Sequence, residues 1–593
     1  MKTIKTIGVF ILISHFTLLA GVPLPRTHNP LLPYFMEQIN FQSVLLNVYG
    51  QNVSGIIPDR YSDLNWNPAF ILQSSGNSVY VDFNYQVANN SYNSYSNIYM
   101  SGSNSVSPNW YNNTSVNSLQ LNPLFNFALI QKINDKISIA IINRSLFDYG
   151  QFRSSSNRSN YSNSSLSSMS YDSEAYNDLE LTTVEVEKNQ QSVWGTQTEF
   201  NLGYNFSPKI DIGLKFGHYI FRQSGELNDS RYSKQPHSLI DEYNNEDFKI
   251  NGDQYEIGAG IVYHLDEKTN LGLYLSIMTG SSSEKNIAFD NSHSWSENNV
   301  DTNYYSINKY NLASNYSFST DGSSPFLSLT FQKEFSTCLE LRSFFSFRQI
   351  NKDITGSISS TDTSYTDRTF DAYNSTTHNY YFSRNESSGR AKDLLDGDGK
   401  ETMENYQWFA SLIYKPESEW SVFAAVMLQM QSKETEFSEK SIYYNNYNFK
   451  SYYYMPRDEN RFNSQLKNYN YHYSYKKWSA IIPVGIKAHI YGGFSFLIGT
   501  DLRFDLIEIK ESGDLLYPKR VNRTTENGVI VVEDIELNRP ETYDAYRPNE
   551  FSKTSSINFG AFYEHSSGLK LYVKTDSDIF NNNFWTFGIE YGH

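Results

Sequence analysis

A strict alternation of apolar and polar residues recurs along this chain and limits its fold more than any other feature. Between positions 209 and 217, Ile210, Ile212, Leu214 and Phe216 are separated only by charged residues and glycine. Because successive side chains of a strand point to opposite faces, this segment has one apolar face and one polar face. A single strand of this kind would fit a soluble sandwich as well as a membrane barrel.

The same pattern recurs in pairs of short segments that are joined by tight turns, and long stretches rich in Ser, Asn and Tyr separate the pairs. This alternation is typical of outer-membrane barrels, which have short periplasmic turns and long external loops. We therefore predict an all-β fold, a transmembrane antiparallel β-barrel of about sixteen strands, with fourteen as the alternative count. The predicted strands lie near residues 79–85, 122–132, 137–141, 200–206, 210–216, 255–263, 271–277, 327–331, 339–341, 408–414, 420–428, 482–488, 494–498, 557–563, 569–573 and 585–591.

A secreted β-sandwich or propeller is the alternative fold, and the residues of the polar face weigh against it. The outer face of a sandwich carries Thr, Lys and Glu, whereas the polar face here repeatedly contains glycine, which suits a curved wall around a crowded lumen. Aromatic residues make up 16% of the chain, as expected for the aromatic girdles of a membrane barrel. The glycines are Gly203, Gly213, Gly217, Gly258, Gly260, Gly485, Gly499, Gly560 and Gly588.

The N-terminus predicts export. Lys2 and Lys5 precede an apolar stretch that ends at Ala20 and Gly21, as in a secretory signal peptide. Cys338 is the only cysteine, so the sequence offers neither a lipidation site nor a disulfide. We predict a signal peptide over residues 1–20, an N-terminal periplasmic or hatch segment over 21–77, and the barrel over 78–593, in the outer membrane of a Gram-negative bacterium.

The charge and the motifs exclude several functions. The formal net charge is −16 and no basic stripe is present, so nucleic acid is a poor partner. The expected partners are outer-membrane lipid, lipopolysaccharide and a small-molecule solute. No catalytic or phosphate-binding motif occurs, so we expect neither an enzyme nor a cofactor. The stretch Asp396–Glu401 resembles a calcium loop, but Lys400 stands where an oxygen ligand is needed, so we predict a solvated loop turn and no metal site.

Charged residues of both signs fall on the polar face and are predicted to line the lumen. They could form a solute path or an electrostatic constriction, or they could pair across the wall and stabilise the barrel. Without the register of the strands, the sequence does not say which charges meet. The candidates are Glu199, Asp211, Lys215, Glu256, Glu340, Arg342, Lys487, Asp501 and Arg503, with Arg144 and Asp505 beside them.

Residues 61–71 read Tyr-Ser-Asp-Leu-Asn-Trp-Asn-Pro-Ala-Phe-Ile, in which Asp63 and Trp66 precede the turn Asn67-Pro68-Ala69. This stretch resembles the Asn-Pro-Ala turn of the long-chain fatty acid transporter family of Gram-negative bacteria, including related barrels of Bacteroidetes. The resemblance implies that the N-terminal segment folds into the barrel as a hatch, with Asp63, Trp66, Asn67 and Pro68 at its turn. This chain departs from the family at Phe70, where glycine is usual, and in its strand count, since the family has fourteen strands. A loose periplasmic leader is the alternative for this segment.

The expected function is uptake or passive passage of small solutes, hydrophobic ones among them. The alternative is a surface-binding or secretion-partner barrel that acts through Tyr-rich extracellular loops while its lumen stays closed. Tyrosine gives rigid contact area with a polar tip, which suits contacts with proteins or glycans. The Tyr-dense stretch over residues 443–475 could serve this purpose or could extend the strands above the membrane.

Overall fold

The computed structural model describes residue 48 and residues 54–74, 76–84, 125–148, 182–235, 238–298, 303–374, 379–417, 420–452, 456–546, 549–576 and 585–592. The predicted signal peptide lies outside the described residues. Two short 3-10 helices, η1 (Ser62–Asn65) and η2 (Pro68–Gln73), precede the first strand. Within the described ranges, no helix is long and apolar enough to cross a membrane.

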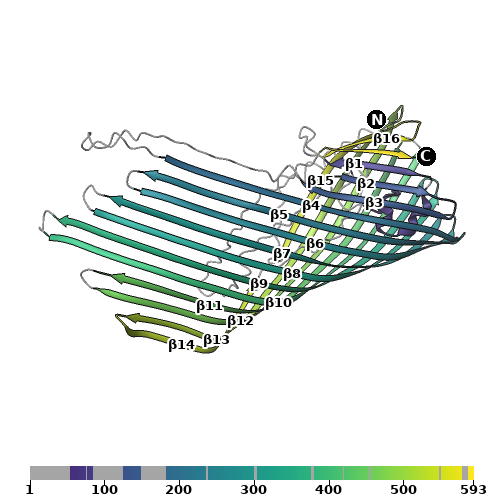
Figure 1. The fold of residues 1–593 in the computed structure, drawn as a ribbon. Helices are drawn as coiled ribbons and strands as arrows, with labels where there is room; N and C mark the ends of the chain where they lie inside the picture. The colour runs from purple at the N-terminus through teal and green to yellow at the C-terminus, as the bar shows by residue number, and fades with distance from the viewer. Residues whose placement is uncertain are drawn as a thin grey trace.

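The remaining described elements form one antiparallel sheet of 17 strands that closes on itself (Figure 1). β1 pairs with both β2 and β17, so the first and last strands complete the ring. The strands are β1 (Ser78–Asn84), β2 (Phe125–Lys132), β3 (Ile137–Asp148), β4 (Thr182–Ser207), β5 (Ile210–Gln235), β6 (Ser238–Asp266), β7 (Thr269–Asn298), β8 (Asn303–Ser336), β9 (Leu339–Asn374), β10 (Asn379–Glu417), β11 (Trp420–Ser451), β12 (Arg457–Tyr491), β13 (Phe494–Glu526), β14 (Val529–Tyr546), β15 (Glu550–Glu564), β16 (Leu569–Asp576) and β17 (Thr586–Gly592).

The ring itself contains 16 strands, as predicted. β13 pairs with β14 over residues 510–526 and with β15 over residues 494–507, so β14 and β15 share one position in the sheet. Every segment that the alternation predicted as a strand overlaps a strand of the ring. The all-β barrel is therefore confirmed, and β14 is the one strand that the sequence analysis did not anticipate.

Short turns connect the strands at one end of the ring, and their residues explain why the chain reverses there. In the turn before β3, Asn134 Oδ1 accepts hydrogen bonds from the backbone nitrogens of Lys136 at 2.8 Å and Ile137 at 2.9 Å. Between β12 and β13, Gly492 and Gly493 adopt φ values of 59° and 91°, a region that glycine enters without steric cost. These local preferences fix the hairpins that the sequence predicted.

An apolar belt encircles the outside of the ring. Its upper limit is sharp where Tyr406, Met430 and Trp478 lie side by side on β10, β11 and β12, because the next outward-facing row is Glu404, Ser432 and Lys476. Exposed apolar side chains fill the belt below that limit. They include Leu214, Phe216, Ile257, Ile261, Leu271, Leu273, Leu275, Ile277, Leu329, Leu412, Val426, Leu428, Ile486, Phe496, Ile498, Leu571, Phe587 and Ile589.

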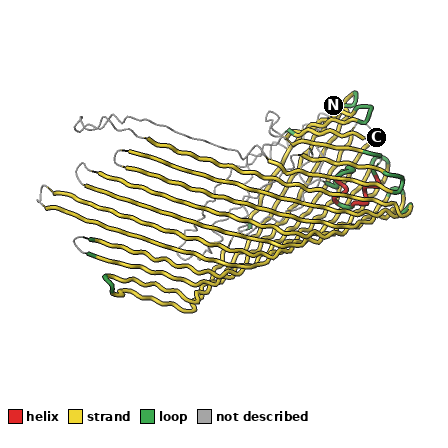
Figure 2. Tube along the Cα trace, viewed as in Figure 1, coloured by secondary structure: helices red, strands yellow, loops and turns green. Residues whose placement is uncertain are grey.

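Strands β4 to β14 continue far beyond the belt and form a curved sheet outside it (Figures 1 and 2). β10 alone has 39 residues, so most of the polar stretches that we expected as loops are strands. Asp396–Glu401 lies within β10 and pairs on both sides, which makes the predicted loop turn wrong. Pairing with β9 and β11 satisfies the backbone there and overrides the turn preference of glycine and aspartate.

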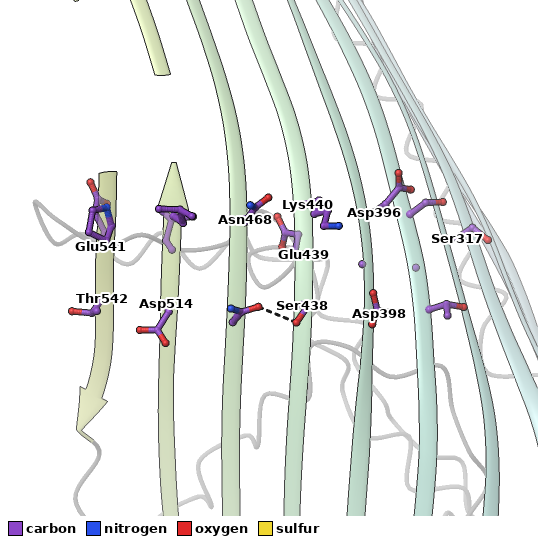
Figure 3. Close-up of a pocket in the computed structure, with 18 of the residues that line it drawn as sticks. Ser317, Asp396, Asp398, Ser438, Glu439, Lys440, Asn468, Asp514, Glu541 and Thr542 are labelled. Carbon is purple, nitrogen blue, oxygen red and sulfur yellow. Dashed lines mark hydrogen bonds between the residues drawn. The ribbon is translucent and has the colours of Figure 1, made fainter. Parts of the chain in front are cut away.

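The outer face of this extension is polar and hollowed (Figure 3). A groove of about 1070 Å³ crosses β8 to β14, and Asp398, Ser438 and Asp514 lie along one of its rows. The Ser438 hydroxyl donates a hydrogen bond of 2.9 Å to Asn470 Oδ1 across this row. Because these side chains are polar, the outer face of the extension can contact water, unlike the apolar outer face of the belt below it.

Within the described residues, the Tyr-dense stretch lies mainly in strands β11 and β12 of the extension. Tyr469, Tyr471, Tyr473 and Tyr475 alternate along β12 on the inner face and are buried. They form an apolar cluster with Phe437 of β11. These four tyrosines therefore contribute to the packing of the extension and are not loop residues.

Glu439 provides a test of this packing, because its carboxyl group is buried on β11 beyond the belt. Burial raises the pKa of Glu439 to about 8. Native protein thus binds a proton that unfolded protein releases near pH 4.5, so this residue's contribution to stability is lost as pH rises toward 8. We expect Glu439→Gln to stabilise the barrel by ~2–4 kcal/mol at pH 9 relative to wild type and to change little at pH 4.5. Urea unfolding in lipid at both pH values measures this, and equal effects at both would contradict it.

Candidate functional site

Residues 54–74, which we call the plug segment, lie inside the ring near the end with short turns (Figures 1 and 2). Ile56, Leu64 and Ile71 have no exposed surface. They belong to one apolar cluster with residues of the inner wall, among them Phe344 and Phe409. The plug segment is therefore packed against the wall through a continuous apolar interface.

The Asn-Pro-Ala turn forms because each residue suits its position. Asn67 is the N-cap of η2, and its side-chain oxygen accepts a hydrogen bond of 2.9 Å from Ala69 N. Pro68 occupies the first helical position, where its fixed φ suits the helix and its missing N–H costs nothing. The amide group of Asn67 is left free to donate elsewhere.

That amide group attaches the turn to the barrel wall. Asn67 Nδ2 donates to the carbonyl oxygens of Ile261 on β6, at 3.1 Å, and Leu273 on β7, at 3.2 Å. The close approach depends on glycine, because a Cβ added at Gly260 would collide with the Asn67 side chain and one at Gly213 would collide with the backbone of Ala69. The wall thus contains a glycine-lined notch that the turn fills.

A buried ion pair holds the other helix of the plug segment. Asp63 of η1 receives two hydrogen bonds from Arg342 on β9, at 2.8 Å from Nη2 and 3.2 Å from Nη1. Arg342 Nε also lies 3.7 Å from Glu340, which in turn lies 3.6 Å from Lys415 Nζ. The Asp63 carboxyl group and the Arg342 guanidinium therefore form a pair with two hydrogen bonds inside the barrel.

Trp66 completes the contact between the plug segment and β9 and β10. Its ring meets Phe344 and Phe409 edge-on, with centroids 5.3 Å apart in both cases. Its indole nitrogen donates to the Ser54 carbonyl at 3.0 Å, so the polar end of the side chain is satisfied within the plug segment. Ser411 on β10 adds a hydrogen bond of 2.7 Å to the Ile56 carbonyl.

We expect Asp63→Ala to loosen the plug segment while the barrel stays folded. The substitution leaves Arg342 buried without its carboxylate, which costs on the order of 3 kcal/mol of docking free energy. Limited proteolysis of detergent-folded protein should then cleave within residues 54–74 at least tenfold faster. The control is Glu340→Ala, because Glu340 lies farther from Arg342 and is more exposed. Equal cleavage of Asp63→Ala and wild type would contradict the proposed anchor.

Beside the plug segment, two acidic and two basic side chains form a buried network on β3 to β6. Glu199 contacts Arg144, and its second carboxylate oxygen lies 3.2 Å from Lys215 Nζ. Lys215 Nζ also lies 3.3 Å from Glu256 Oε2. All four side chains are 3% exposed or less, so opposite charges pair across neighbouring strands of the wall. This network stabilises charges that would be costly if left alone.

The other sequence candidates also lie on the inner face, but away from this network. Asp211 lies 2.9 Å from His264 Nε2 near the short turns. Lys487 stands over the Phe562 ring, with Nζ 4.6 Å from the centroid. Asp501 accepts a hydrogen bond from Ser556, and Arg503 Nε donates to Asp505 Oδ2 at 2.9 Å.

Sequence reasoning missed the hydroxyl groups that complete the Glu256 site. Tyr219 and Tyr274 both donate to the Glu256 carboxylate, the latter at 3.1 Å, and Ser276 donates at 2.7 Å. Each lies on the polar face of its strand. Its place in the alternation of apolar and polar residues was the only signal that the sequence offered. Their meeting point depends on the register of β5, β6 and β7, which spacing alone does not specify.

The closed ring, its outward apolar belt and its satisfied backbone define a transmembrane β-barrel of the outer membrane, with a segment of its own chain packed inside.

No protein-family model matches the chain, and no curated protein matches its sequence. Solved structures that match this chain include a FadL homologue of Pseudomonas aeruginosa, 10% identical, with a TM-score of 0.30 over 92% of this chain and 97% of that chain. Another is the ferric yersiniabactin uptake receptor FyuA of Yersinia pestis, 9% identical, with a TM-score of 0.21 over 79% of this chain and 77% of that chain.

Proposed function

We propose that this barrel passes small solutes, hydrophobic ones among them, across the outer membrane and that the plug segment controls the passage. A ring of this strand number is wide enough to enclose a channel when nothing fills it. The observation that carries the proposal is the way the plug segment is held. Discrete polar contacts attach it to the wall: Asn67 to β6 and β7, Asp63 to Arg342, the Ile56 carbonyl to Ser411, and Arg60 to Glu590.

The inner wall supports passage of solutes with apolar parts as well as polar ones. Apolar side chains of the wall, such as Phe344 and Phe409, face the plug segment, and the nearby charges Glu199 and Lys215 are paired. A wall whose charges are paired offers no strong single-sign field that would select ions. The uptake proposed here is therefore driven by solute gradients and limited by movement of the plug segment.

Conductance and solute flux test this proposal. Purified protein in planar bilayers should conduct weakly, and a variant lacking residues 22–77 should conduct at least tenfold better. Liposome swelling with sugars of graded size should rank the variants in the same order. A change of mobility on heating in a detergent gel checks that each variant is a folded barrel. If folded protein without residues 22–77 shows neither conductance nor swelling, transport through this lumen is wrong.

The alternative function, binding at the cell surface with a closed lumen, is favoured by one observation. The sheet extends far beyond the belt, although a channel alone needs only the belt. The alternative predicts that protein lacking residues 22–77 remains non-conducting while the extension binds a partner. The conductance experiment therefore separates the two functions.

A further inference from the structure

β14 stands at a free edge of the extension. It pairs with β13 alone among the described strands, from Val529 opposite Glu526 to Tyr546 opposite Lys510. Its place is well defined, because the turn Asn527-Gly528 has the positive φ values, 50° and 80°, of a tight hairpin. Asn527 also exchanges hydrogen bonds with the backbone of Asp458 at the start of β12, at 2.7 and 2.9 Å. The edge is therefore held in place before any partner arrives.

The side chains of this edge are unusually apolar for a surface in water. Val529, Ile530, Val531, Val532, Ile535 and Leu537 are all between 50% and 65% exposed. Lipid does not cover them, because they pair with residues 519–526 of β13. Glu508 and Lys510, which precede that part of β13, already lie beyond the upper limit of the belt. Soluble proteins protect long edge strands with lysine, proline or a covering element. Before Pro540 this strand contains neither lysine nor proline; its charged residues are Glu533, Asp534, Glu536 and Arg539, and a β-bulge lies at Val531.

The acidic residues of β14 determine which kind of strand could pair with its free edge. Glu533, Asp534 and Glu536 follow the aliphatic run. Two copies of Val529–Leu537, paired antiparallel along their whole length, would place Glu533 opposite Glu533, which is unfavourable. A strand from a different protein, with aliphatic residues opposite Val529–Val532 and Lys or Arg opposite the acids, has no such conflict.

We propose that the free edge of β14 binds an extended segment of another protein at the cell surface, a segment with an aliphatic half and a basic half. The segment adds a strand antiparallel to β14, so that backbone hydrogen bonds supply affinity and side chains supply specificity. Arg523 of β13 contacts Glu533, and both Arg520 of β13 and Arg539 of β14 contact Glu536, so these carboxylates are held in place along the edge. This interaction is independent of transport through the lumen.

A fluorescent peptide tests the proposal on the full-length protein in nanodiscs. The probe has the sequence Val-Lys-Val-Lys-Lys-Val-Val-Val-Val, which places lysine opposite Glu536, Asp534 and Glu533 in the antiparallel register. Two further probes carry N-methyl groups on alternate backbone nitrogens, one on the odd positions and one on the even positions. In an added strand only one of these sets faces β14. We expect one N-methyl probe to bind at least tenfold more weakly than the parent and the other to bind within about twofold.

Two controls identify the site and the chemistry. A probe with glutamate in place of lysine should bind at least tenfold more weakly, and Val531→Cys in a Cys338→Ser background should form a disulfide with a cysteine-bearing probe. Absence of saturable binding, or equal weakening by both N-methyl probes, would overturn strand addition at β14. A dimer of the protein that is crosslinked through Val531→Cys would assign the edge to a second copy and overturn the basic partner.

Discussion

Replacing Gly213 by leucine is expected to release the plug segment and raise conductance in planar bilayers at least tenfold. A Cβ at this position would collide with the backbone of Pro68 and Ala69, and backbone cannot rotate away as a flexible side chain can. The wall is fixed by pairing on both sides of β5, so the turn must leave the notch. Gly213→Ala should have a smaller effect in the same direction.

Gly389 supplies the matched control, because a Cβ there would crowd the Ser364 hydroxyl at 2.6 Å, which can rotate, and would meet its next neighbour, Tyr447 Cδ2, at an ordinary contact distance of 3.7 Å. Gly389→Ala should conduct like wild type and should show the same heat-dependent mobility on a detergent gel. If folded Gly213→Leu conducts like wild type and protects residues 54–74 equally from protease, the notch does not hold the plug segment.

A lysine at Val426 is expected to destabilise the barrel by ~2–4 kcal/mol, because this side chain faces lipid well inside the belt. Val426 is 43% exposed on β11 and lies between Trp420 and Met430, which mark the two ends of the belt on that strand. A charge there must be buried in hydrocarbon or must reach the surface by distorting the strand. Urea unfolding in lipid vesicles measures the loss.

Ser438 is the matched position, since it faces the same side of the same strand beyond the belt. Ser438→Lys should change the free energy of unfolding by less than ~0.5 kcal/mol. Similar losses at Val426 and Ser438 would mean that the belt does not lie in the membrane.

The lower part of the barrel could be predicted from sequence because lipid demands an apolar residue at every second position. Ile210, Ile212, Leu214 and Phe216 of β5 carry that signal clearly. Above the belt the outer face contacts water and the inner face is packed largely by tyrosine, so the apolar–polar alternation fades and Asp396–Asp398 of β10 looked like a loop. β14 escaped notice although Asn527-Gly528 before an aliphatic run is a hairpin signal, because its run does not alternate.

The interior was harder to predict than the wall. The Asn67-Pro68-Ala69 turn is local, so its cap and helix follow from three adjacent residues. Its attachment to Ile261 and Leu273 joins positions about 200 residues apart, and only the folded ring brings them together. Likewise, the sequence marked Asp63 and Arg342 as candidate site residues, but it did not show that they pair with each other.

Closure of the ring between β1 and β17 has a consequence for the order of assembly. The plug segment precedes β1 in the chain, and its Tyr61 packs against Tyr80 of that strand, with tilted rings whose centroids are 5.3 Å apart. The opposite side of the plug segment is attached to β6, β7, β9 and β10. We expect the growing sheet to curl around the plug segment, so that β17 seals a barrel already filled, and the membrane never meets an open pore during biogenesis.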